Sequence, residues 1–466
     1  MKRIFQFILL MTVILSTLLI IAACDDDDDD DDDDNDTTGD DDDDTADDDD
    51  DSEEPFKVGF ARSDISPDHS VILAGYGLSF LSDAFCRWSE GVHDPIYATA
   101  VAFEHPDSQP VILIHLDVVG AIITDIERIQ EQIAQSLGTT PERVLVAASH
   151  SHGTPDAVGI WGVLIPPRSG RDDEFIEGMI DGAVQAGIAA YENRMPATLA
   201  AAAGIEADMH YNPQHKVDHD AITDDNMTLL AAYDYDGNLI GTLMSWGCHP
   251  MVMGPQNKMI TADYIGPYYR MMDEELGGIN MYVNSSLGAT VHPQNPFDPF
   301  PMEGNSWGTW EDLDNFGRVL ADDAQALIAD AQPLQDYSVH LISKTVSGKL
   351  ENPLFALAGQ LDLIPRDMPP LGEYGDTTMS AFSIGPVRFA TVPGELVPDL
   401  GLQCREIMGG EYQFLITLGM DWLGYIMTEE QYRSIFYIYF SILSVGPTMG
   451  DVVTSEFELT FAQWPQ

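Results

Sequence analysis

Residues 111–153 read VILIHLDVVGAIITDIERIQEQIAQSLGTTPERVLVAASHSHG and contain two apolar runs separated by an amphipathic segment. The runs at 111–116 and 143–148 are short and end in polar residues, which is typical of buried strands. Isoleucines recur at helical spacing between them and predict a helix over residues 122–137. A strand–helix–strand order predicts that the two strands pair in parallel, in a sheet covered by helices.

The rest of the chain after Pro55 shows the same mixture of apolar runs and amphipathic segments. Two more helices are expected, over residues 173–191 and from about 313 to 327. Further buried strands are expected at 239–245, 279–284, 387–392 and 414–418. Residues 55–466 contain no sequence repeat and no low-complexity break. We therefore expect a single large α/β domain with a mixed, largely parallel sheet flanked by helices.

The N-terminus has the pattern of an export signal. Lys2 and Arg3 precede an apolar run, and small residues come directly before Cys24. This arrangement resembles the bacterial lipoprotein signal, which predicts a signal peptide over residues 1–23 and lipidation of Cys24. The expected location is an exported, membrane-anchored lipoprotein at the periplasmic face or the cell surface. The alternative is an uncleaved membrane helix, since about 20 apolar residues can span a bilayer.

An acidic tract follows the signal. Residues 25–54 hold 21 Asp and 2 Glu and no basic residue. Like charges repel and nothing apolar is available for burial, so residues 24–54 are expected to be a lipidated cysteine followed by a disordered tether. Calcium binding by the tract is the alternative reading.

The charge balance limits the partners. The chain has 78 acidic residues against 20 Lys and Arg, which excludes nucleic acid as a partner because phosphate binding needs clustered bases. The acidity outside the tract indicates either a solvated surface suited to a salty medium or repulsion from anionic lipid, which would favour neutral or cationic substrates. The oligomeric state is left open.

Three cysteines remain if Cys24 is lipidated, namely Cys86, Cys248 and Cys404. An odd number permits at most one disulfide among them, and an exported compartment would allow it. No Cys-x-x-Cys spacing is present to indicate a cysteine zinc site.

Polar residues follow the expected strands where chemistry is normally found. In α/β sheets, ligands bind beyond the carboxyl ends of the strands. Six side chains are therefore candidates for one site, although they are far apart in sequence: His150, His152, His249, Ser285, Glu395 and Tyr425.

The spacing of His150 and His152 suggests a metal site. In extended backbone, residues two apart point to the same side, so both rings can enter one cavity. Two or three His with one carboxylate are the ligands of a catalytic zinc, which activates water and polarises a carbonyl. A surface pair of histidines without metal is the alternative.

Several segments, in this order and spacing, resemble the catalytic domain of the neutral (non-lysosomal) ceramidases. They cover nearly all of residues 57–450 and are more specific together than any one alone. The matching segments are Val58–Ile65, Gly75–Gly77, Gly91–Ala98, Ser149–Gly153, His249–Pro250 with Ala262–Gly266, Pro393–Glu395 and Gly424–Ile426.

This resemblance implies a zinc amidohydrolase that splits ceramide into a fatty acid and sphingosine. It assigns the zinc ligands to His150, His249, Glu395 and Tyr425, with Tyr425 also helping to stabilise the oxyanion. It makes His152 the residue that contacts the reacting amide and moves the proton, with a further zinc ligand as the alternative. It gives Ser285 a catalytic role, the alternative being a loop serine bonded to backbone.

The chain departs from the family pattern in three places. Gly288-Ala289 stands where the family has Gly-Asp, followed here by Thr290. The substrate-facing arginine of the family has no matching position. The C-terminal immunoglobulin-like module of ceramidases is expected to be absent, because the chain ends at Gln466.

We therefore expect a membrane-tethered zinc hydrolase that cleaves the amide bond of ceramide or a related N-acyl amphiphile. One alternative is a surface lipoprotein of the same fold that binds lipid or sugar without turnover, which the altered loop after Ser285 favours. The other is a zinc hydrolase with a non-lipid amide or ester substrate. An apolar groove at the site would favour the lipid substrate.

Overall fold

The computed structural model describes residues 54–77, 85–163, 165–294 and 308–464. The expected signal peptide, Cys24 and the acidic tract lie outside these residues. The described residues belong to one compact unit. None of their helices is both long and apolar enough to cross a bilayer.

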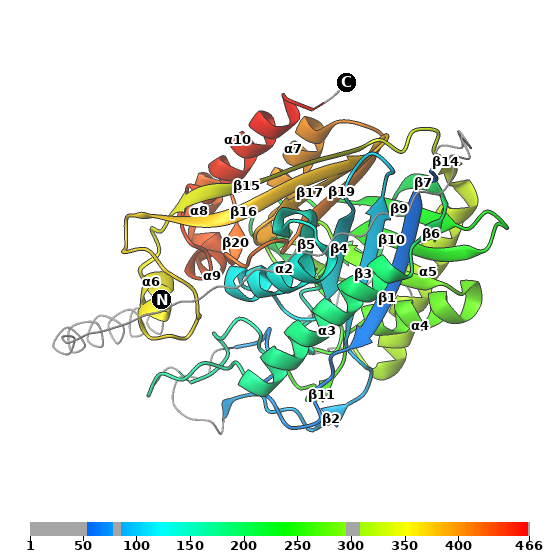
Figure 1. Ribbon diagram of the computed structural model, residues 1–466. Helices are drawn as coiled ribbons and strands as arrows, with labels where there is room; N and C mark the ends of the chain where they lie inside the picture. Colours follow the sequence, from blue (N-terminus) through cyan, green and yellow to red (C-terminus); the bar gives the residue numbers. More distant parts are fainter. Residues whose placement is uncertain (1–53, 78–84, 164, 295–307, 465–466) are drawn as a thin grey trace, which may run out of the picture. The chain divides into compact units, whose positions relative to one another are not determined.

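The first sheet has the strand order β5-β4-β3-β1-β6, and α2 and α3 cover one of its faces (Figure 1). The side chain of Asp172 accepts a hydrogen bond from Phe175 and begins α3, whereas Gly138 ends α2 with a φ of 65°. The bounds are β1 Lys57–Asp64, β3 Tyr97–Glu104, β4 Val111–Leu116, β5 Val144–Ala148, β6 Met195–Pro196, α2 Ile123–Leu137 and α3 Asp173–Glu192.

The second sheet has the order β12-β10-β9-β7-β14 and is covered on its outer face by α4 and α5. Its inner face packs on the first sheet, where Gly241 of β10 lies against the ring of Phe60. The layers are therefore helix, sheet, sheet and helix. The bounds are β7 Thr198–Ile205, β9 Asn226–Tyr233, β10 Leu239–Trp246, β12 Ile279–Asn284, β14 Gln332–Pro333, α4 Ile265–Leu276 and α5 Trp310–Asp330.

The third sheet has the order β15-β16-β17-β19, with α7 and α10 packed against it (Figure 1). The buried rings of Phe382, Phe389 and Phe414 stack across its neighbouring strands β16, β17 and β19, with centroids 4.1 and 4.7 Å apart. The bounds are β15 Val339–Lys349, β16 Tyr374–Ile384, β17 Val387–Val392, β19 Tyr412–Thr417, α7 Pro398–Met408 and α10 Met449–Phe461.

Short elements connect the sheets and carry several site residues. They include three strand pairs: β2 Gly91–Val92 with β11 Met259–Ile260, β8 His210–Tyr211 with β13 His292–Pro293, and β18 Glu395–Leu396 with β20 Tyr425–Ile426. The short helices are η2 Pro141–Arg143, η3 Pro213–Lys216, α6 Pro353–Gln360, α8 Glu429–Arg433, η4 Ile435–Tyr437 and α9 Ile438–Ile442.

The expectation of a largely parallel sheet is wrong, because most strand pairs are antiparallel. Each large sheet contains one parallel pair, and a helix joins its two strands: β4-α2-β5, β10-α4-β12 and β17-α7-β19. The remaining pairs include hairpins with short connections, such as β3–β4 and β9–β10. The parallel pairing predicted for the strands within residues 111–148 is confirmed. Extending that pairing to most of the chain is wrong, because other strands are joined by hairpins and hairpin strands pair antiparallel.

The α/β character is confirmed, and the expected helices and strands occur close to their expected bounds. The helix expected near 313–327 is longer, because Thr309 and Asp312 form a capping box that starts α5 at Trp310. Cys86, Cys248 and Cys404 are all free thiols, and all are buried.

Candidate metal centre

His150 follows β5 in a backbone conformation that few residues adopt. Its φ is 63°, so the expectation of an extended His150–His152 segment is wrong, although both rings still enter one site. The backbone N–H of His150 bonds to Val118 at 2.9 Å, and ring Nδ1 lies 2.6 Å from the carbonyl oxygen of Val119. A carbonyl only accepts, so Nδ1 carries a proton, and in the neutral ring this leaves the lone pair on Nε2.

His249 and Glu395 come to the same point from two other sheets. His249 follows β10, and its backbone N–H bonds to Val291 at 2.9 Å. Glu395 follows β17 and opens β18. Glu395 Oε2 lies 3.2 Å from His150 Nε2 and 3.5 Å from His249 Nε2. All three side chains are buried.

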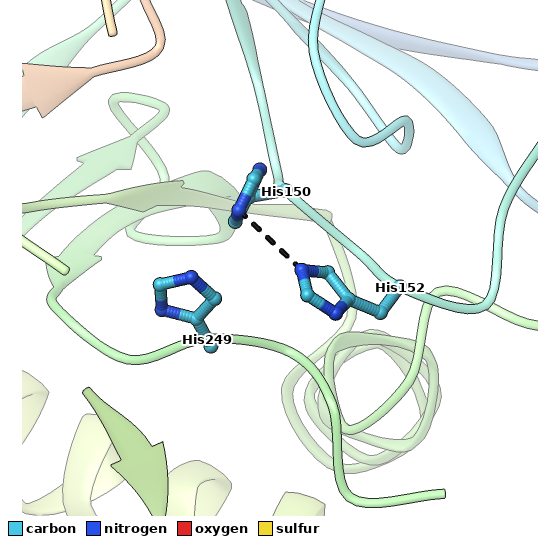
Figure 2. A group of neighbouring side chains, drawn as sticks. All are labelled: His150, His152 and His249. Atoms are coloured by element: carbon cyan, nitrogen blue, oxygen red, sulfur yellow. Dashed lines mark hydrogen bonds between the residues drawn. The ribbon is translucent and has the colours of Figure 1, made fainter. Parts of the chain in front are cut away.

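His152 completes a cluster of three histidines (Figure 2). Its Nε2 lies 3.4 Å from His150 Nε2. One nitrogen from each of His150, His152 and His249 lies within 4.8 Å of the others. This buried group could bind a metal ion.

The chemistry of the donor set fits a cation. His150 Nε2, His249 Nε2 and Glu395 Oε2 converge, and the last two have no hydrogen-bond partner among the described residues. Buried acceptors that face one another without donors repel and are costly to desolvate. A divalent cation satisfies them together, and histidine nitrogen with carboxylate oxygen is a common zinc ligand set.

Burial and charge shift the acidities of the cluster. Burial alone would raise the pKa of Glu395, but the electrostatic effect of the adjacent His150 and His249 rings outweighs it and lowers the pKa to about 2. Burial lowers the pKa of His249 to about 4, although Glu395 opposes this shift. Burial and the neighbouring histidines also hold the pKa of His152 well below its usual value. The carboxylate is therefore charged and these two rings are neutral at pH 7.

Tyr425 lies beside Glu395, because β18 and β20 pair in parallel with these two residues in register. Its hydroxyl lies 3.2 Å from Thr290 Oγ1. Burial, and next the charge of Glu395, raise the pKa of Tyr425 well above its usual value. The side chain is therefore a neutral phenol whose hydroxyl faces Thr290 and Glu395.

A cavity of about 380 Å³ opens from the cluster toward the surface. His152 and Tyr425 line its inner part together with Thr290 and His292. Most of its wall is apolar or aromatic, formed by Tyr76, Met251, Phe436, Ile438, Tyr439 and Phe440. Its size and mixed lining are those of a small-molecule site.

One wall of the cavity depends on a glycine. Gly75 has a φ of 98°, and a Cβ there would lie 2.3 Å from the ring of His152. This close approach lets Tyr76 pack edge-on against His152, with ring centroids 4.8 Å apart. The guanidinium of Arg87 lies over the Tyr76 ring and donates to the carbonyl oxygen of His152.

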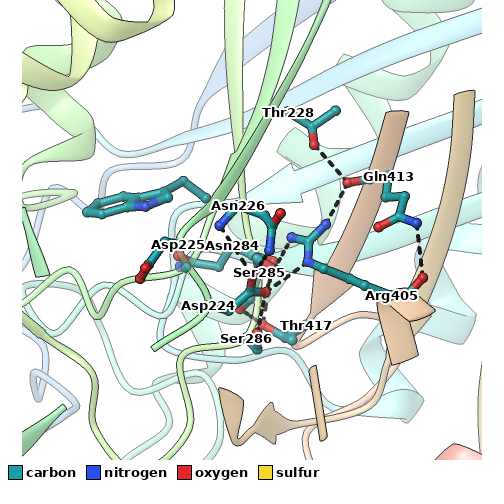
Figure 3. Close-up of polar contacts among 12 residues, drawn as sticks. Asp224, Asp225, Asn226, Thr228, Asn284, Ser285, Ser286, Arg405, Gln413 and Thr417 are labelled. Carbon is teal, nitrogen blue, oxygen red and sulfur yellow. Dashed lines mark hydrogen bonds and ion pairs between the residues drawn. The ribbon is translucent and has the colours of Figure 1, made fainter. Parts of the chain in front are cut away.

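Ser285 lies in a different environment, within a buried polar network (Figure 3). Its hydroxyl donates to Asp224 Oδ2 at 3.1 Å and accepts from Arg405 at 2.7 Å. Ser286 and Arg405 also bond to Asp224 Oδ2, at 2.6 and 2.9 Å. The structure therefore brings together His150, His152, His249, Glu395 and Tyr425, and it engages the Ser285 hydroxyl in a neighbouring network. The roles assigned to all six remain predictions.

Two aspartates near the histidines hold backbone rather than rings. Asp263 accepts from the N–H groups of Val252 and Met253, and so shapes the loop after His249. Asp117 accepts from the N–H of Tyr97 at 2.9 Å. Both carboxylates therefore bind backbone N–H groups, Asp263 in a turn and Asp117 at the start of a strand.

The sequence alone did not identify several cavity residues. Tyr76 was part of a recognised motif, but no pattern gave it a role. Thr290 and His292 belong to the segment that departs from the family, and the apolar run 435–440 reads as ordinary core. Only the folded chain brings these segments beside His152 and Tyr425.

Fold and site together define a layered α/β protein with a buried histidine–carboxylate centre next to an apolar cavity, which His152 and Tyr425 line. The sequence profile of the neutral/alkaline non-lysosomal ceramidase family, N-terminal region, matches residues 56–301, which is more than half of the chain. The chain therefore belongs to the neutral/alkaline non-lysosomal ceramidase family. Glu395 and Tyr425 lie beyond the matched region.

Individual relatives are distant. Neutral ceramidase 1 of Arabidopsis thaliana is 22% identical over 236 residues, which are 48% of this chain and 30% of that protein. Neutral ceramidase A of Dictyostelium discoideum is 23% identical over 229 residues, which are 46% of this chain and 31% of that protein. The match thus spans about a third of the length of these curated relatives.

Solved structures show the same fold. The neutral ceramidase from Pseudomonas aeruginosa superposes with a TM-score of 0.70 at 16% identity, covering 88% of this chain and 75% of that one. A structure of a ceramidase complexed with C2 gives a TM-score of 0.69 at 16% identity, covering 87% and 74%.

Proposed function

We propose that the protein is a zinc-dependent amidohydrolase that cleaves ceramide or a related N-acyl amphiphile into a fatty acid and an amine. Family membership supports the amide-cleaving class. The observation that carries the proposal is the convergence of unpartnered groups from His249 and Glu395 with His150, beside His152 and Tyr425, which line an apolar cavity. An apolar wall favours a lipid amide over a small polar one.

His150, His249, Glu395 and Tyr425 would hold the zinc, with His152 beside them. When bound there, zinc supplies Lewis-acid activation of water and of the amide carbonyl. The Val119 carbonyl keeps the proton of His150 on Nδ1, so that Nε2 presents a lone pair to the site. Glu395 would supply the negative charge of the ligand set, because its low pKa keeps the carboxylate ionised at pH 7.

Two residues that line the cavity would act on the substrate. His152 lines the cavity and would take a proton from the attacking water and deliver it to the leaving amine. Tyr425 also lines the cavity, and its hydroxyl would stabilise negative charge on the carbonyl oxygen as that charge develops. Thr290 holds that hydroxyl at 3.2 Å, and the apolar wall keeps bulk water from the amide.

The test is a hydrolysis screen of the purified full chain on ceramide, shorter N-acyl amines, a water-soluble amide and an ester, with and without a zinc chelator. We expect fatty acid release from the lipid amides, its loss with chelator, and its return when zinc is added. The His150→Ala variant should release none. Chelator-resistant release would contradict the metal role. Cleavage of the soluble amide or ester alone would favour a zinc hydrolase with a non-lipid substrate. Lipid binding without cleavage would favour a lipoprotein that binds lipid without turnover.

We further propose that residues 1–23 are a lipoprotein signal, that lipidated Cys24 and the acidic tract to residue 54 tether the protein, and that residues 55–466 form the catalytic domain. The sequence before and after Cys24 supports this export and anchoring. Mass spectrometry of the mature N-terminus should find a lipidated Cys24. The Cys24→Ser variant should move from the membrane fraction to the soluble fraction, and an unmodified Cys24 would contradict the proposal.

A further inference from the structure

A short apolar segment forms the outer edge of the cavity. Ile435, Phe436, Ile438 and Tyr439 belong to η4 and α9, and they are 67%, 55%, 38% and 54% exposed. Three of them, Phe436, Ile438 and Tyr439, also line the cavity shared with His152 and Tyr425. We call these four side chains the apolar rim. The rim joins the surface of the protein directly to the candidate active site.

The backbone beneath the rim is firmly held. Tyr437 and Phe440 alternate with the rim residues and are buried. The Tyr437 hydroxyl donates to Asp218 at 2.9 Å. The Phe440 ring packs edge-on against Tyr425, with centroids 4.8 Å apart. Ser441 Oγ bonds to the carbonyl oxygens of Tyr432 and Tyr437. The exposed side chains therefore project from an anchored segment.

The exposure is concentrated in one place. Four large apolar side chains fall within five consecutive residues, whereas other exposed ones, such as Ile205 and Tyr235, are separate in sequence. Single exposed apolar residues are ordinary, but a contiguous group marks a surface that contacts a partner. Its continuity with the cavity indicates a partner that also delivers the substrate.

Charge selects the kind of partner. The neighbouring helix α8 carries Glu429, Glu430 and Arg433, and Arg433 already pairs with Glu429 at 2.7 Å. The chain as a whole has 78 acidic residues against 20 basic ones. An anionic surface would therefore be repelled, whereas an apolar surface without net charge would not. Aromatic and aliphatic side chains together suit the boundary between head groups and acyl chains.

We propose that the apolar rim docks on a zwitterionic lipid bilayer, so that the cavity opens into the lipid from which an N-acyl amphiphile enters. The substrate part rests on the proposed function, whereas docking can be measured without turnover. Insertion of the rim moves its side chains out of water, which is the driving force for binding.

The test places an environment-sensitive dye on the rim. The full chain carries Cys24→Ser, which removes the expected lipid anchor, and Ile435→Cys for labelling; the other cysteines are buried. Ile205, in β7, is 70% exposed and supplies the matched control Ile205→Cys. We expect the dye at 435, but not at 205, to shift to the blue with phosphatidylcholine vesicles, and less so when phosphatidylglycerol is added. No shift at 435, or equal shifts at both positions, would overturn the proposal.

A second arm separates docking from catalysis. Ile435 does not line the cavity, so Ile435→Ser should lower hydrolysis of vesicle-borne substrate about ten-fold and leave hydrolysis of a water-soluble short-chain N-acyl amine unchanged. Equal losses on both substrates would overturn the rim's docking role. A blue shift with no turnover of any substrate would uphold docking and refute the proposed function. A dimer in sedimentation that Ile435→Ser dissociates, with no vesicle binding, would assign the rim to a second copy of the chain.

Discussion

The histidine cluster and the network around Asp224 are two buried polar groups in neighbouring parts of the fold. His249 follows β10, and Ser285 follows β12, the parallel neighbour of β10. In the cluster, His249 Nε2 and Glu395 Oε2 have no hydrogen-bond partner. In the network, Asp224 accepts from Ser285, Ser286 and Arg405, and Arg405 also donates to the carbonyl oxygen of Gln413.

This difference distinguishes a ligand-binding site, the histidine cluster, from a structural network, the one around Asp224. Polar groups that satisfy one another stabilise the fold only while the set is complete. Acceptors left without donors instead call for a ligand. The loop that begins at Ser285 links the cluster and the network. At its start, the Thr417 hydroxyl donates to the carbonyl oxygen of Ser285. Three residues later, the N–H of Gly288 donates to the carbonyl oxygen of Leu396, the neighbour of Glu395.

The largest effect is expected at the cluster. Replacing His249 with alanine removes one converging acceptor, and hydrolysis should fall by at least about 10³-fold, or ~4 kcal/mol of transition-state stabilisation. In the metal-free protein, any loss of stability should come from the lost packing of the buried ring, because its nitrogen Nε2 has no hydrogen-bond partner. Rates and urea unfolding of the metal-free variant measure the two effects. A variant that is less stable but keeps its specific activity would show that His249 supports the fold and not the reaction.

The opposite pattern is expected in the network. Asp224→Ala leaves the buried guanidinium of Arg405 unpaired, which should lower the free energy of unfolding by about 3–5 kcal/mol. The folded fraction should still bind metal. Urea unfolding with metal analysis checks both results. The double variant Asp224→Ala/Arg405→Met is the control and should recover part of the loss. Full stability in the single variant would contradict the support role.

The same carboxylate gives a pH dependence. Burial opposes ionisation of Asp224, but Arg405 and the hydrogen bonds outweigh it, so the folded pKa lies below the ordinary value of 3.8. The stability contributed by this carboxylate is therefore complete above pH 3.8 and is lost as the pH falls through the folded pKa. The stability difference between wild type and Asp224→Asn should shrink over that range in acid unfolding curves. A stability difference that grows as the pH falls would show that folding raises, and does not lower, the pKa of Asp224.

Ser285→Ala tests whether Ser285 acts in the reaction or only supports the fold. The hydroxyl bonds to Asp224 and Arg405, so its loss should cost about 1–3 kcal/mol of stability. If support is its only role, kcat should change less than about ten-fold. A large fall in kcat with unchanged stability would instead confirm the catalytic role predicted from the family resemblance.

The smallest effect is expected at Thr290, which contacts the cluster through Tyr425. Thr290→Val keeps the shape and removes one hydrogen bond, so about 1 kcal/mol, or roughly five-fold in kcat, should be lost. Thr290→Ser keeps the hydroxyl and should retain most of the wild-type kcat. Equal losses in both variants would mean that shape, not the bond to Tyr425, accounts for the effect.

The sequence predicted the local elements well and the pairing of strands poorly. The apolar run 111–116 and the isoleucines after it carry their own periodicity, so β4 and α2 were found. β7 was not, because its alanine-rich sequence has no distinctive apolar run. Strand partners depend on hairpins such as β9–β10, and the polar turn between them gives little indication of the sheet they join.

The candidate site likewise has residues that could be predicted from local patterns or the family resemblance, and others that could not. His150 and His152 could be paired from their spacing, and His249, Glu395 and Tyr425 from the resemblance. No sequence rule brings Thr290, Tyr76 and the apolar rim to the same cavity, because these three segments lie more than one hundred residues from one another in the sequence. The network around Asp224 was equally hidden, since Asp224 and Arg405 meet only across the fold.

The most direct test is the zinc content of the purified full chain, measured by mass spectrometry together with a competition titration. We predict one zinc per chain in the wild type, near-complete loss in His150→Ala and in Glu395→Ala, and retention in Ser285→Ala. A wild type that binds no divalent metal, or variants of His150 and Glu395 that bind as tightly as the wild type, would contradict the assignment of a metal centre to this cluster.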